Sequence, residues 1–63
     1  GLAVITELVK QSYLFLPDKG KCLIEIGIAQ DQAVKALATK QGFYEATFIE
    51  DFQGTNRVVE LSR

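Results

Sequence analysis

The chain has 63 residues, of which 48% are hydrophobic and 24% are charged, and its formal net charge is −1. This length allows one small domain or a piece of a larger one, and the composition excludes the disordered and strongly polyionic classes. Its seven basic residues are spread along the chain, so we expect no nucleic-acid partner, because no basic stripe is available to displace counterions from phosphates.

An amphipathic helix is expected over residues 2–15. Its face consists of positions that recur at steps of one and three, namely Val4, Ile5, Leu8, Val9, Ser12, Tyr13 and Leu16. Pro17 disfavours helical geometry at Leu16, and the stretch from Pro17 to Gly20 has the composition of a turn. Since the helix begins within the first two residues and no initiator methionine precedes it, the sequence is interpreted as an excised fragment.

A strand is expected over residues 21–28, where apolar residues are nearly continuous. This pattern is typical of a parallel strand that is covered on both faces, so the strand is predicted to be central. The run is far shorter than the roughly 20 residues of a membrane span, and no secretory signal precedes it. Cys22 is the only cysteine and the chain has no histidine, which favours a buried thiol in a reducing, cytoplasmic compartment.

The remaining expected elements are a helix over residues 30–41 and strands over residues 43–52 and 57–62. The helix begins near Asp31 and stops at Gly42. Aromatic and β-branched residues mark the strands, and the loop between them is too short for a parallel crossover. The prediction is an α/β fold of order helix, strand, helix, strand, strand, in which the last strand can lie antiparallel between the other two.

Candidate substrate-pocket or supporting residues are Glu25, Gly27, Gln30, Asp51 and Arg57. Ligands of open α/β sheets bind beyond the carboxyl ends of the strands, where Glu25 and Gly27 are expected. Glu25 either supports a pocket or reaches solvent, and Gln30 either faces the same mouth or caps the following helix. Arg57 either holds a carboxylate of a partner or pairs with Asp51 across the hairpin.

No catalytic, cofactor-binding or metal-binding residue is predicted in the chain itself. A complete cofactor loop after the first strand is rejected, because glycines end at Gly27 and the next three positions are Ile28, Ala29 and Gln30. Their Cβ atoms would hold a ligand away from the backbone N–H groups of the helix that follows.

Several short motifs follow one another in a distinctive order: Gly1-Leu2, Leu16-Pro17 with Gly20, Leu23 to Gly27 with Gln30, Ala33-Val34, Gly42-Phe43, and Asp51, Gly54 and Arg57-Val58-Val59. This set resembles the C-terminal end of HemK-type methyltransferases, which methylate the side-chain amide of a glutamine in peptide-chain release factors. The resemblance covers essentially residues 1–63. It implies the last part of a Rossmann-like class I methyltransferase sheet, with S-adenosylmethionine as cofactor and a release factor as partner of the parent protein.

The family's cofactor loop and its Asn-Pro-Pro-Tyr segment do not occur in these residues. The segment is therefore expected to be mainly architectural, to line a pocket wall, to bind no S-adenosylmethionine alone and to be inactive in isolation. The alternative is a stand-alone interaction module that recruits a partner strand at its sheet edge. Without preceding strands, the strand at residues 21–28 has one unpaired apolar edge, and the isolated chain is expected to self-associate there.

Overall fold

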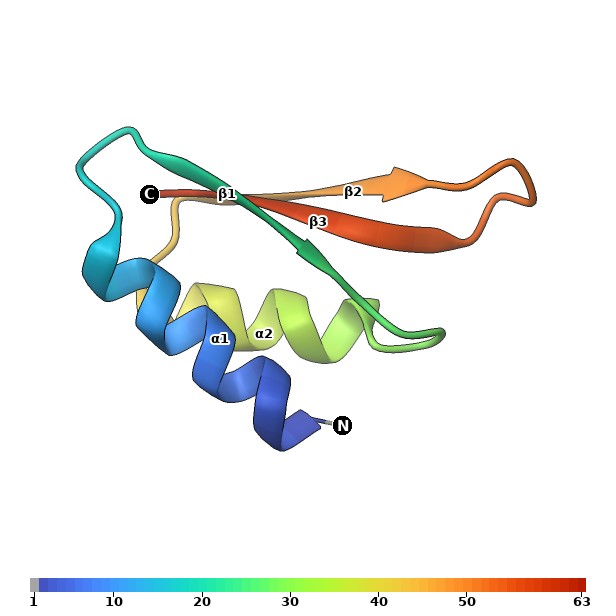
Figure 1. Cartoon of the computed structure of the whole chain (residues 1–63), viewed down its shortest axis with the longest axis horizontal. Coiled ribbons are helices and arrows are strands. Elements are labelled where there is room, and N and C mark those ends of the chain that lie inside the picture. Colours follow the sequence, from blue (N-terminus) through green and yellow to red (C-terminus); the bar gives the residue numbers. More distant parts are fainter. Residues whose placement is uncertain (1) are drawn as a thin grey trace.

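A computed structural model describes residues 2–63 and contains two helices and a three-stranded sheet (Figure 1). The elements in chain order are α1 (Leu2–Phe15), β1 (Lys21–Glu25), α2 (Asp31–Gln41), β2 (Glu45–Glu50) and β3 (Asn56–Ser62). The helices and β3 lie within one residue of the ranges expected from the sequence. The strands expected over residues 21–28 and 43–52 are shorter in the structure.

The final strand lies in the middle of the sheet, whose order is β1-β3-β2. β3 is antiparallel to both neighbours, with Ile24 and Phe48 on either side of Val59. β1 and β2 therefore run in the same direction, and the antiparallel last strand between them agrees with the prediction. A shift in the β2–β3 register falls between Ile49 and Glu50, near the end of β2.

β1 is not the central strand, covered on both faces, that its apolar run predicted. It is an edge strand of the sheet, its burial alternates, and only Ile24 among its five residues is buried. Leu23, on the opposite face, is 64% exposed, and the thiol-bearing Cys22 is only half-buried. The physical reason is that both helices pack on one face of the sheet (Figure 1), so the other face has no covering layer among residues 2–63.

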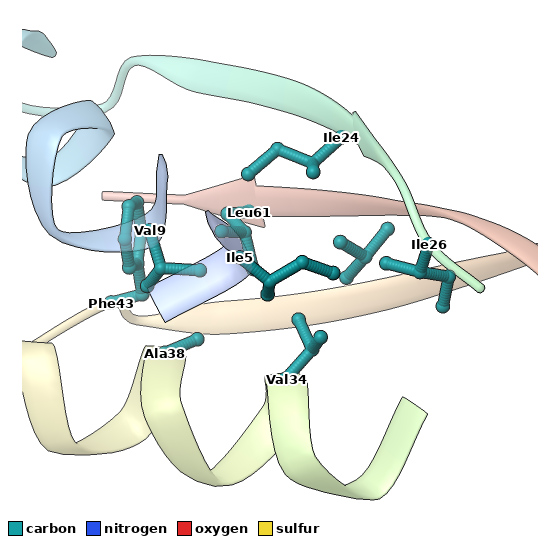
Figure 2. Close-up of a cluster of buried hydrophobic side chains, with 9 residues drawn as sticks. Ile5, Val9, Ile24, Ile26, Val34, Ala38, Phe43 and Leu61 are labelled. Atoms are coloured by element: carbon teal, nitrogen blue, oxygen red, sulfur yellow. The ribbon is translucent and has the colours of Figure 1, made fainter. Parts of the chain in front are cut away.

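The core lies between this sheet face and the two helices (Figure 2). Its buried side chains come from both helices, from β1 and β3, and from the loops that follow β1 and α2, namely Ile5, Val9, Ile24, Ile26, Val34, Ala38, Phe43, Val59 and Leu61. Ala46 and Phe48 of β2 pack against it while half-buried. Gly42 follows the last residue of α2 and caps the helix; its φ of 115° is left-handed, and its N–H donates to the carbonyls of Ala38 and Thr39.

Arg63 joins the end of α1 to the sheet, a contact that the sequence analysis missed. Its Nη1 donates to the carbonyl oxygens of Tyr13, at 2.9 Å, and of Leu16. The guanidinium carbon also lies 4.3 Å from the centroid of the Tyr13 ring. The backbone of Arg63 continues the connection, because its N–H donates to Gly20 O at 2.9 Å and its carbonyl accepts from Lys19 N at 3.2 Å.

Neither helix in the described residues is long and apolar enough to cross a bilayer.

Candidate functional site

The five candidate residues gather at one end of the sheet. Because β1 and β2 both run antiparallel to β3, their carboxyl ends lie at the same end as the start of β3. Ile26 N donates to Arg57 O at 2.9 Å, which holds the chain after β1 against the beginning of β3. The loop after β1 and the turn between β2 and β3 therefore project from the same end (Figure 1).

The β1–α2 loop is closed by Gln30. Its Oε1 accepts a hydrogen bond from Gly27 N at 2.7 Å, while Gln30 N donates to Gly27 O at 3.2 Å. Gln30 occupies the position before α2 but makes no side-chain cap bond to that helix, so the capping interpretation is wrong. The amide instead folds back onto the loop, in which Ala29 has a left-handed φ of 65°.

The loop leaves no open space beside Gly27 in this structure. A Cβ on Gly27 would lie 3.0 Å from Gln30 Oε1, so the space beside Gly27 is filled by the protein's own amide. The Gly27 N–H is already bonded to that oxygen, whereas a cofactor cradle needs free N–H groups and open backbone. The Gln30 amide is therefore part of the loop's own hydrogen bonding.

The β2–β3 turn is organised by the carboxylate of Asp51. Its Oδ1 accepts from Gln53 N at 2.8 Å and from Thr55 N at 3.0 Å. Its Oδ2 lies 3.2 Å from Arg57 Nε, so the ion pair across the hairpin forms as predicted. Gly54, with a φ of 80°, permits the tight turn that brings these groups together. The Asp51 carboxylate thus joins Gln53 and Thr55 of the turn to Arg57 of β3.

These contacts lower the pKa of Asp51 below its ordinary value of 3.8. The backbone N–H of Thr55 is the largest cause and that of Gln53 the next, since both stabilise the charged carboxylate. Partial desolvation opposes the shift, and the hydrogen bond and positive charge of Arg57 add to the lowering.

We expect the hairpin's stabilisation by Asp51 to be lost in acid. A group with a depressed pKa in the folded state contributes stability above its unfolded pKa, and the contribution disappears as pH falls through the folded value. The melting temperature of the wild type should therefore exceed that of Asp51→Asn at neutral pH, and the difference should shrink as pH falls below 3.8. Melting curves of both proteins at several pH values test this, and a constant difference down to strong acid would contradict it.

The hairpin is also tied to α2. Asn56 Nδ2 donates to Asp31 Oδ2 at 3.0 Å, which links the first residue of β3 to the first residue of α2. Sequence reasoning assigned Asp31 only to the helix start. The two residues are 25 positions apart, and no local pattern identifies such a pair.

Glu25 is exposed at the end of β1 and lies opposite Val58 of β3. Of its two interpretations, exposure to solvent at the mouth of the sheet agrees with this position. The structure brings the backbone of Arg57 next to the residue after Glu25, but the Arg57 side chain pairs with Asp51. The candidate residues therefore belong mainly to two neighbouring loops, the β1–α2 loop and the β2–β3 turn, and each loop is held by its own hydrogen bonds.

Four surface hollows are lined by residues of α1, of α2, of the α2–β2 loop and of the start of β2, and none of these four includes a candidate residue. One of about 410 Å³ is an open apolar face of α1 formed by Ala3, Val4, Glu7, Leu8 and Gln11. In residues 2–63, no three His, Cys, Asp or Glu side chains are grouped so that they could hold a metal ion.

Comparison with known proteins relates the chain to methyltransferases. Over 62 residues it is 32% identical to a protein named bifunctional methyltransferase from Rickettsia typhi (strain ATCC VR-144 / Wilmington), and the same values hold for a protein of that name from Rickettsia prowazekii (strain Madrid E). The match covers 98% of this chain but only 12% of the length of each relative. No family model and no solved structure matches the chain.

Proposed function

We propose that the chain is the C-terminal part of a HemK-type methyltransferase domain, and that the whole protein methylates the side-chain amide of a glutamine in peptide-chain release factors. The observation that carries the proposal is the similarity to two bifunctional methyltransferases over nearly the full length of the chain. The antiparallel strand β3 between the parallel strands β1 and β2 is consistent with the proposal. The family that the chain resembles has such a strand at the end of its sheet. The protein would act in the cytoplasm, with S-adenosylmethionine as the methyl donor.

In the longer protein, a Rossmann-like sheet would continue from the free edge of β1. A strand placed before α1 and parallel to β1 would make α1 the crossover helix of a βαβ unit, for which a right-handed connection is the rule. The packing of Ile5 and Val9 in the same core as Ile24 of β1 supports this role for α1. The added strand would cover the backbone groups that β1 leaves unpaired in residues 2–63.

The contribution of this segment is architectural. Gln30 fills the space beside Gly27, so the groups that hold S-adenosylmethionine and the acceptor amide would belong to residues outside this chain. Glu25 and the Asp51–Arg57 pair would line one wall at the sheet end. The hydrogen bonds within the β1–α2 loop and the β2–β3 turn would keep that wall in place while a protein substrate enters.

Methyl transfer by the full-length protein tests the proposal. Purified protein is incubated with S-adenosylmethionine carrying a labelled methyl group and with a peptide-chain release factor, and mass spectrometry locates the label. We expect one methyl group on a glutamine side-chain amide, and no labelling when that glutamine is replaced by alanine. Labelling of a different acceptor class, with none on the release factor, would overturn the substrate assignment. Equal activity in a protein that lacks residues 1–63 would overturn the architectural role.

The interaction-module alternative depends on the free edge of β1, which the structure contains. The coding sequence upstream of Gly1 separates the two functions. A glycine-rich loop and an Asn-Pro-Pro-Tyr segment in the same reading frame would favour the methyltransferase, whereas a reading frame that starts near Gly1 would favour the module.

A further inference from the structure

The free edge of β1 presents a regular row of backbone groups. Ile26 N donates to Arg57 O, and Arg63 N donates to Gly20 O, so the even-numbered residues at both ends of β1 bond to β3. In an antiparallel ladder, alternate residues direct their N–H and C=O groups to opposite sides. The groups of Lys21, Leu23 and Glu25 consequently point away from β3, toward the open side of the strand.

These same three residues have side chains on the outer, uncovered face of the sheet. Lys21, Leu23 and Glu25 are all exposed, whereas Ile24 between them is buried in the core. Along the edge the order is thus a positive charge, an apolar group and a negative charge. When a second copy of β1 runs in the opposite direction, its negative end therefore meets the positive end of the first copy, and the two apolar groups meet in the middle.

Only one antiparallel register uses the whole edge. If Leu23 of one copy lies opposite Leu23 of another, Lys21 lies opposite Glu25 at both ends, and each of these pairs can exchange two backbone hydrogen bonds. A shift by two residues in either direction loses one pair and places a charge opposite Leu23. A shift by one residue places the odd-numbered residues of one copy opposite the even-numbered residues of the other. The backbone groups of the even-numbered residues already bond to β3, so they cannot bond across the contact.

We propose that the 63-residue chain forms a symmetric dimer through β1, with Lys21 opposite Glu25 of the second copy and Leu23 opposite Leu23. The contact is isologous, as twofold symmetry requires, and joins the two three-stranded sheets into one. Cross-strand pairs of opposite charge and of apolar groups stabilise it. The inference does not rest on the proposed methyltransferase function. It applies to the chain by itself, because a strand supplied by a longer protein would occupy the same edge.

Charge reversal tests both the dimer and its register. Glu25→Lys places lysines opposite each other at both ends of the contact, and Lys21→Glu places glutamates there. Each variant alone should dissociate at least about tenfold more readily than the wild type, since like charges oppose each other twice per dimer. An equimolar mixture of the two variants should form a heterodimer, because each end then pairs lysine with glutamate. Analytical ultracentrifugation measures the masses, with one variant fluorescently labelled.

The control concerns Glu60, whose Oε1 lies 3.6 Å from Lys21 Nζ within the same chain. Lys21→Glu disrupts this pair as well, so melting curves of each variant show whether the fold is retained. Glu50→Lys serves as the matched control, because it reverses an exposed charge at the end of β2, away from the β1 edge, and it should leave the dimer unchanged. A monomeric wild type would overturn the proposal, and so would a dimer whose dissociation is unchanged in both charge-reversal variants. So would a mixture in which no heterodimer forms.

Discussion

Replacement of Leu61 by alanine is expected to remove a large part of the free energy of unfolding of the chain. Leu61 is fully buried on the central strand, where it lies opposite Cys22 on one side and Ala46 on the other. Truncation of a buried leucine to alanine costs about 2–5 kcal/mol, because the lost transfer energy adds to the cost of the cavity. A chain of 63 residues has a total stability of only about 3–9 kcal/mol, so this loss is comparable with the whole margin.

Urea titrations followed by circular dichroism measure the change, at one fixed protein concentration because association is linked to folding. Leu14→Ala is the matched control, since it makes the same chemical change at a side chain that is 62% exposed on α1. That variant should shift the free energy of unfolding by no more than about 0.5 kcal/mol. Equal transition midpoints for the two variants would contradict the assigned core.

The helices and the strand order could be predicted because their signals are local. Ile5 and Val9 repeat at helical spacing and become the buried side of α1, and Gly42 stops α2 in the left-handed conformation that glycine adopts readily. The four-residue loop before β3 allowed only a hairpin. If the first two strands are parallel but not adjacent, that constraint allows β3 to lie between them, as it does in the structure.

The position of β1 could not be predicted in the same way. An apolar run indicates what a strand can bury, whereas its actual burial depends on which layers are present. Leu23 suits a covered face, yet both helices pack against the opposite side.

Contacts between distant residues are the other feature that local patterns do not contain. Gln30 lies where a helix cap is expected, but its side chain accepts a hydrogen bond from Gly27 N, which precedes it in the chain. The conformation of the loop determines which of these two contacts forms. Asn56 meets Asp31 across 25 positions, and Arg63 meets Tyr13 across 50. Of the candidate site, the Asp51–Arg57 pair was predicted because both residues flank one short turn.

Replacement of Arg63 by alanine is expected to detach the end of α1 from the sheet. The guanidinium donates to two carbonyls near the end of α1, which have no partner within the helix, and it lies over the Tyr13 ring. A positive charge is favourable at this helix end, and hydrogen bonds to charged groups contribute about 1.5–3 kcal/mol. Tyr13 in turn meets Phe43 edge to face, with centroids 5.2 Å apart, so its orientation should loosen as well.

Two variants distinguish this role from that of a generic surface cation. Arg63→Lys keeps the charge but cannot bond both carbonyls and stack on Tyr13 in one geometry, so it should restore only part of the lost stability. Arg57→Ala removes a side chain that is 48% exposed and forms a single ion pair with Asp51, for which the cost should not exceed about 1 kcal/mol. Urea unfolding should therefore rank the proteins, from most to least stable, as wild type, Arg57→Ala and Arg63→Ala, with Arg63→Lys above Arg63→Ala. If Arg63→Ala were as stable as Arg57→Ala, the contacts of Arg63 would contribute no more than one exposed ion pair, and α1 would be held mainly by the packing of its apolar side chains on the core.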